Sequence, residues 1–102
     1  MLELRPTCEH CNTALPPDST EARICSFECT FCRACVEQLL HDVCPNCGGG
    51  FVPRPVRPAQ DWRNGNFLGR YPATATVTHK PVDATAQAAL VARVGALPPA
   101  AR

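Results

Sequence analysis

The fold is decided by residues 8–47, which read CEHCNTALPPDSTEARICSFECTFCRACVEQLLHDVCPNC. All eight cysteines of the 102-residue chain fall within this stretch, so one residue in five there is a cysteine. A segment of about 40 residues seldom folds on apolar burial alone and usually needs disulfides, metals or oligomerisation. The sequence therefore predicts a scaffold built on cysteine chemistry, and its length excludes a large enzyme fold.

The cysteines are spaced as metal ligands are. A C-x2-C turn directs two sulfurs at one Zn²⁺ with bonds of about 2.3 Å, and freed backbone N–H groups can donate to the sulfurs. Asn12 and Gly48, which follow the first and last pairs, suit such a turn. Eight thiolates make two tetrahedral sites, so we expect two Zn²⁺ as cofactors. The pairs are Cys8 and Cys11, Cys25 and Cys29, Cys32 and Cys35, and Cys44 and Cys47.

The order of these ligands resembles that of the RING finger. Phe31 stands where RING fingers have an aromatic residue before the fifth ligand, residues 36–39 resemble the helix after the sixth, and Cys44-Pro45-Asn46-Cys47 resembles the last pair. The resemblance implies a cross-brace, in which the two sites share interleaved parts of the chain. It assigns one zinc to Cys8, Cys11, Cys32 and Cys35, and the other to Cys25, Cys29, Cys44 and Cys47.

Residues 1 to about 52 also look like a family of short bacterial cysteine-rich proteins of unknown function. The likeness is carried by the opening MLELRP, by PPDSTEARIC over residues 16–25 and by SFECTFC over residues 26–32. It implies a bacterial setting and no particular activity.

Other assignments of the cysteines stay open on spacing alone. Sequential pairing would place the first four cysteines on one zinc and the last four on another. The run from Cys29 to Cys35 is similar to a ferredoxin-type iron–sulfur motif, but eight residues instead of three separate Cys35 from Cys44. Four disulfides would need an oxidising compartment. We expect His10 and His41 to be surface or outer-shell residues, because eight thiolates already fill two sites.

The predicted fold class is a small metal-stabilised, RING-like domain over residues 1–52. Short apolar runs predict a β-hairpin within residues 21–31, and helical spacing of apolar residues predicts one short helix over residues 33–43, before Cys44-Pro45. The apolar set is too small to hold this domain without metal. It comprises Leu15, Ile24, Phe27, Phe31, Val36, Leu39, Leu40 and Phe51.

A different composition begins at residue 53. Alternate prolines and arginines followed by an aperiodic stretch predict a disordered linker over residues 53–82. Residues 83–102 predict an Ala-rich tail with a marginal helix, which Asp83 can cap and Gly95 can terminate.

Charge divides the chain in the same place. Residues 1–52 carry three arginines against seven carboxylates, a formal charge of −4, whereas residues 53–102 carry seven basic residues against two carboxylates, a formal charge of +5. The N-terminus lacks the pattern of a secretory signal, and no apolar run approaches the roughly 18 residues of a membrane span. We therefore expect a cytoplasmic protein without membrane contact, in a reducing compartment where clustered cysteines bind metals.

The leading functional hypothesis is a zinc-built module that binds a protein partner, with contacts around His10 and Pro45. Its two sites are closed, which argues against direct catalysis and for structural zinc. A RING-type ubiquitin-ligase adaptor is less favoured, because His10 and Gly48 stand where such ligases carry an apolar and a basic residue. A thiolate redox or zinc sensor is a further alternative.

Nucleic-acid binding is the remaining alternative, and we expect it only through the basic tail. The tail interleaves arginines with aromatic residues, a combination that single-stranded nucleic acid can use. The residues concerned are Arg54, Arg57, Arg63 and Arg70, with Trp62, Phe67 and Tyr71.

Overall fold

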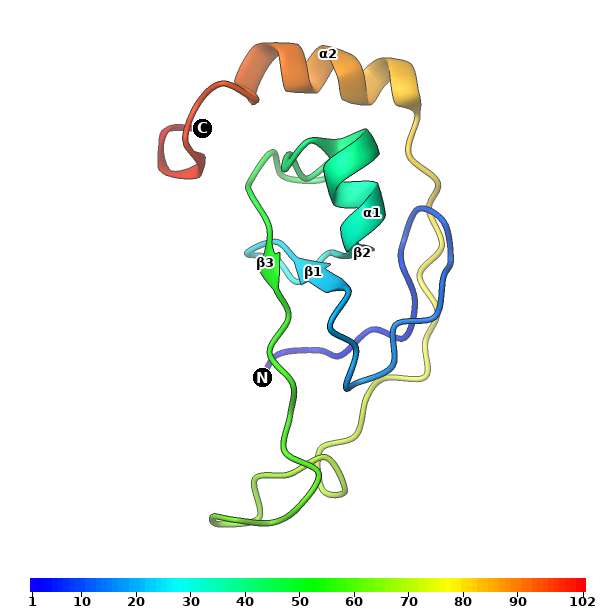
Figure 1. The fold of residues 1–102 in the computed structure, drawn as a ribbon, viewed down its shortest axis with the longest axis vertical. Helices are drawn as coiled ribbons and strands as arrows, with labels where there is room; N and C mark the ends of the chain where they lie inside the picture. Colours follow the sequence, from blue (N-terminus) through cyan, green and yellow to red (C-terminus); the bar gives the residue numbers. More distant parts are fainter.

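A β-hairpin lies at the centre of the fold in a computed structural model that describes residues 1–102. Strand β1 (Ala22–Ile24) pairs antiparallel with β2 (Thr30–Cys32), and β3 (Val52–Pro53) pairs with the other edge of β1 (Figure 1). The sheet order is therefore β2-β1-β3. This arrangement confirms the hairpin predicted within residues 21–31.

The register of the sheet places Arg23 of β1 between one residue of each neighbouring strand. Arg23 lies opposite Phe31 on one side and opposite Pro53 on the other. Pro53 has no N–H group to donate, and it accordingly occupies an edge strand. The sheet thus takes in the first residue beyond the predicted domain end, and independent folding of residues 1–52 stays a prediction.

One helical segment follows β2 without a linker. It begins as α1 (Arg33–Cys35) and continues as the π-helical turn η1 (Val36–Leu40). His41 and Asp42 then adopt left-handed conformations, with φ of 49° and 60°. Such residues cannot continue a right-handed helix, so the predicted helix is confirmed but ends before Val43.

The core between sheet and helix contains most of the predicted apolar residues. Phe27 is an exception, because its side chain is 71% exposed in the turn between β1 and β2. Its assignment to the core is therefore wrong. Leu4 and Val43 join the core instead, at 2% and 0% exposure. Among the predicted residues, Leu15, Ile24, Phe31, Val36 and Leu40 are buried, and Leu39 and Phe51 pack against them partly exposed.

The C-terminal half is ordered, so the predicted disordered tail is wrong. Beyond β3 the chain runs away from the helices, turns back in a loop over residues 58–71 and returns past the N-terminal turn (Figure 1). The guanidinium of Arg57 links the end of this loop to the N-terminal segment, because it donates to the carbonyls of Tyr71 (2.6 Å) and Leu2 (2.7 Å). These bonds supply the order that composition alone does not predict.

A buried arginine fastens the start of this tail to the cysteine-rich domain. Arg54 is only 4% exposed, and its side chain donates to the carbonyls of Arg5 (2.8 Å), Leu15 (3.2 Å) and Pro16 (2.9 Å). Burial lowers the pKa of this guanidinium below its usual value. The proline-rich segment is therefore part of the fold.

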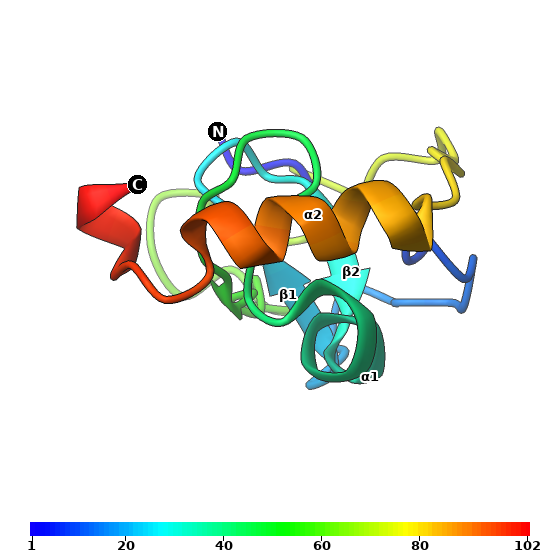
Figure 2. The same ribbon diagram turned by 90° about the horizontal axis from the view of Figure 1, so that it is seen from above.

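The tail helix α2 (Ala84–Val94) forms where the sequence predicts it. Asp83 caps it by accepting the N–H of Ala86 at 2.9 Å. The helix lies across η1 (Figure 2), and contact with η1 supplies stability that an isolated helix of this length lacks. A 3₁₀ turn, η2 (Pro99–Ala101), follows. None of these helices has both the length and the apolar character to cross a membrane.

Candidate metal centre

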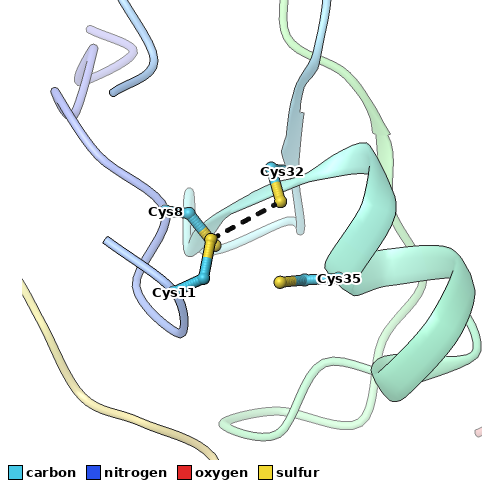
Figure 3. A group of neighbouring side chains, drawn as sticks. All are labelled: Cys8, Cys11, Cys32 and Cys35. Atoms are coloured by element: carbon cyan, nitrogen blue, oxygen red, sulfur yellow. Dashed lines mark hydrogen bonds between the residues drawn. The ribbon is translucent and has the colours of Figure 1, made fainter. Parts of the chain in front are cut away.

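Four sulfurs from two separate parts of the chain meet beside the helix (Figure 3). Cys8 and Cys11 flank the N-terminal turn, Cys32 ends β2 and Cys35 ends α1. All four Sγ atoms lie within 4.8 Å of one another. These are the cysteines that the RING resemblance assigns to one site.

The spacing inside this group suits a tetrahedral ion. The Sγ atoms of Cys11 and Cys32 are 3.8 Å apart. A tetrahedron with metal–sulfur bonds of about 2.3 Å has edges of about 3.8 Å. The group therefore fits Zn²⁺, and its role as a ligand set stays a prediction.

The second group holds Cys25, Cys44 and Cys47, whose Sγ atoms also lie within 4.8 Å of one another. The fourth predicted ligand, Cys29, lies outside that limit. Its carbonyl accepts the N–H of Cys25 at 3.2 Å, and its Sγ accepts a hydrogen bond from the Asn46 amide at 3.5 Å. The structure thus brings three of the four predicted residues together and leaves the fourth beside them.

Two turns present the paired cysteines in the same way. Asn12 (φ 62°) donates its N–H to the carbonyl of Cys8 at 2.9 Å, and Gly48 (φ 77°) donates to the carbonyl of Cys44 at 2.8 Å. Both residues occupy the left-handed region, as their identities predict. The conformation after each pair keeps the two sulfurs on the same side of the turn.

Backbone N–H groups already point at the sulfurs of the second group. Each comes from the residue two positions after the cysteine, at 3.4 Å. Such donors partly neutralise thiolates around a metal. The three bonds run from Phe27 to Cys25, from Asn46 to Cys44 and from Gly49 to Cys47.

Crowding of thiols shapes the acidity of the first group. Burial opposes ionisation of Cys11, yet hydrogen bonds from Thr13 and Cys8 lower the pKa of Cys11 to about 7. Burial raises the pKa of Cys8, and burial with the neighbouring sulfurs raises that of Cys35 well above its usual value. Without a cation these thiols resist joint ionisation, and a divalent ion reverses that balance.

The second group shows the same preference. Burial is the main cause that raises the pKa of Cys29, and burial also raises that of Cys44. The charges of neighbouring cysteines raise both pKa values further. The group is therefore suited to share its negative charge with a bound cation.

The histidines are placed as outer residues. His10 accepts the N–H of Val82 on Nδ1 at 2.9 Å, and its carbonyl lies 3.1 Å from His79 Nε2. His41 lies at the left-handed end of η1. No histidine belongs to either cysteine group.

Sequence analysis missed a buried glutamate between Cys8 and Cys11. Glu9 is 3% exposed, and its carboxylate accepts hydrogen bonds from Arg5 (3.0 Å) and from the N–H of Thr30. The backbone N–H of Glu9 also donates to the carbonyl of Thr30 at 3.0 Å. Glu9 thus fixes the first turn against β2, and no local pattern distinguishes it from a surface glutamate.

Comparisons with known proteins agree with the cysteine-rich pattern. Residues 1–57 match the profile of a family described as "Protein of unknown function (DUF1272)". An uncharacterized protein of Rhizobium meliloti (strain 1021), R02474, is 54% identical over 81 residues, which cover 79% of this chain and 89% of that protein. This second likeness is too long to be confined to residues 1–57 and includes part of the tail. No solved structure matches the chain.

Proposed function

Because the chain belongs to the DUF1272 family, whose function is unknown, we propose its role from the site itself: a module with two structural zinc ions that binds a protein partner. Membership confirms the predicted likeness to a cysteine-rich family of unknown function. The proposed cross-brace uses the two ligand sets named above, including Cys29. The proposal depends on thiolates, which persist in a reducing compartment such as the cytoplasm.

The interleaving of the two cysteine groups is the observation that carries the metal assignment. The first group joins the N-terminal turn to the end of the hairpin and the start of the helical segment, and the second joins the hairpin turn to the loop after the helical segment. Each ion would therefore crosslink two distant segments. All-sulfur tetrahedral coordination is typical of structural Zn²⁺ and leaves no open position for substrate.

The metal assignment is tested by elemental analysis of protein purified without oxygen. We expect two zinc ions per chain in the wild type and fewer in Cys32→Ser. The variant Ser26→Ala is a matched control, because Ser26 is exposed beside the second group and belongs to neither. One metal or none in the wild type, or iron in place of zinc, would contradict the proposal.

The surface around the hairpin turn supports a protein partner. Phe27 is 71% exposed and Val52 is 59% exposed. A groove of about 400 Å³ nearby is lined by Leu2, Ile24 and Val52 among others. Exposed aromatic and aliphatic residues around a groove are typical of protein contacts.

Charge and hydrogen bonding disfavour the nucleic-acid alternative. With eight thiolates and two Zn²⁺, the formal charge of residues 1–52 becomes −8, which repels phosphate. Arg54 and Arg57 donate to backbone carbonyls of the protein itself. Two of the four tail arginines expected to contact phosphate are therefore already engaged.

The tail also contacts the surface around His10 and Pro45, where the sequence predicts contacts with a protein partner. His10 accepts a hydrogen bond from Val82, and Pro45 lines a cavity together with residues 80–83. The tail therefore bonds to one of these two residues and borders the other. We accordingly favour the exposed hairpin turn as the protein-binding surface.

Photo-crosslinking distinguishes these partners. A photoreactive phenylalanine analogue at position 27 should give a discrete protein adduct in cells, whereas the same group at Ala88, which is exposed on α2, should not. A nucleic-acid adduct from position 27, or identical adducts from both positions, would contradict the protein-binding role.

A further inference from the structure

The C-terminal strap, defined as residues 79–102, contacts the protein at the two turns that carry metal ligands. Its backbone begins on the first turn, where Lys80 donates its N–H to the carbonyl of Glu9 at 2.7 Å and Val82 donates to His10. Both acceptors lie between Cys8 and Cys11. The strap therefore starts on residues enclosed by a ligand pair.

The side chain of Lys80 reaches the other site. Its Nζ donates to Asn46 Oδ1 at 3.5 Å, and Asn46 lies between Cys44 and Cys47. One residue of the strap thus links the turn of the first group to the turn of the second. No other lysine exists in the chain to substitute for it.

Asn46 passes this contact on to a predicted ligand. Its Nδ2 donates to Cys29 Sγ at 3.5 Å. An amide that accepts through oxygen and donates through nitrogen has a fixed orientation, and Lys80 occupies the oxygen. Cys29 is the predicted ligand that lies outside the compact cysteine group. The Asn46 amide therefore orients the one sulfur of the second site that its neighbouring cysteines do not hold in place.

A second strap residue holds the chain that enters the same site. Gln87 is 2% exposed, and its Nε2 donates to the carbonyls of Leu40 (3.1 Å) and Val43 (2.9 Å). Val43 directly precedes Cys44. Gln87 therefore caps the last carbonyl of η1 and also holds the backbone immediately before Cys44.

We propose that the strap is the outer shell of the second metal site, with Lys80 and Asn46 as positioning residues for the Cys29 thiolate. The inference rests on the proposed function, since it presupposes metal at that site. Outer-shell partners orient ligands, and their loss commonly lowers metal affinity 10–100-fold. Docking of the strap and metal retention at the second site are then coupled reciprocally.

The test uses the full chain loaded with zinc, challenged with a coloured chelator, and the chain loaded with ¹¹³Cd for NMR. In Lys80→Met, release of one of the two zinc ions should accelerate about tenfold. Only the ¹¹³Cd resonance that correlates with Cys29 or Cys44 should move. Lys80→Arg, which keeps a cationic donor, should restore slow release, and Arg93→Gln on the exposed face of α2 is the matched control.

A double-mutant cycle shows whether Lys80 acts through Asn46. If it does, Lys80→Met should add little to the release rate of Asn46→Leu. Unchanged release in Lys80→Met, or equal effects on both metal ions, would overturn the inference while leaving two zinc ions in the wild type. Absence of metal from the wild type would instead overturn the proposed function.

Discussion

Two regions of this molecule are held in place by different interactions. Residues 8–47 bring seven of their eight thiols into two groups, with Cys29 beside the second, and bury few large apolar side chains around them. Residues 53–102 contain no cysteine, and polar side chains fasten them by donating to backbone carbonyls of the first region. The difference teaches that a small cysteine-rich domain can order a long extension mainly through hydrogen bonds to its own backbone carbonyls.

Metal removal should separate the two regions most strongly. Structural zinc can contribute roughly 10–16 kcal/mol per site, so chelation should unfold residues 8–47 and release the tail with them. Circular dichroism and amide hydrogen exchange would follow both parts. A chelated protein that keeps the protection of β1 and β2 would show that the cysteine-rich region does not depend on metal.

Loss of the Arg54 guanidinium is the largest change expected within the tail region. Arg54→Met leaves the carbonyls of Leu15 and Pro16 without their donor, and we expect a cost of about 3 kcal/mol in the free energy of unfolding. Urea denaturation of zinc-loaded protein measures it. Arg63→Met is the control, because Arg63 is exposed and its side chain makes no hydrogen bond in the structure. Equal stability of both variants would contradict the anchoring role.

Gln87→Met should have a smaller effect. It removes two hydrogen bonds but leaves an apolar side chain of similar size, so we expect a loss of about 2 kcal/mol. Amides of α2 should exchange faster while those of β1 and β2 are retained. Gln38→Met on the exposed side of η1 provides the comparison. An α2 that keeps its protection in Gln87→Met would show that another contact holds the strap.

Raising the salt concentration should have the smallest effect on the attachment of the tail. The acidic and basic regions could attract each other, but the anchors described above are hydrogen bonds to uncharged carbonyls. Raising salt from about 0.1 M to 1 M shortens the screening length from about 10 Å to 3 Å, and α2 protection should change by less than about 0.5 kcal/mol. Release of α2 at high salt would show that the attraction between regions, and not the carbonyl bonds, holds the tail.

The features that sequence analysis predicted correctly, in the cysteine-rich region and at α2, have local determinants. Cysteine spacing, the left-handed residues Asn12 and Gly48, and the Asp83 cap each depend on a few neighbouring positions. Short apolar runs predicted the hairpin, helical spacing of apolar residues predicted the start of the helix, and Asp83 with Gly95 predicted α2.

The remaining features depend on pairs that are distant in sequence. Arg54 meets Leu15, and Gln87 meets Leu40, across 39 and 47 residues. The residues next to Arg54 in the sequence do not show whether its side chain is buried or solvated. Composition therefore predicted disorder for this segment. Glu9 and Asn46 were missed for the same reason, and Phe27 was assigned to the core by its apolar character alone.

The interleaved pairing of the two sites is the central claim, and ¹¹³Cd-to-cysteine proton correlations test it most directly. We expect one cadmium to correlate with Cys8, Cys11, Cys32 and Cys35, and the other with Cys25, Cys29, Cys44 and Cys47. Correlations that join Cys8 to Cys25 and Cys29 on the same ion would contradict it.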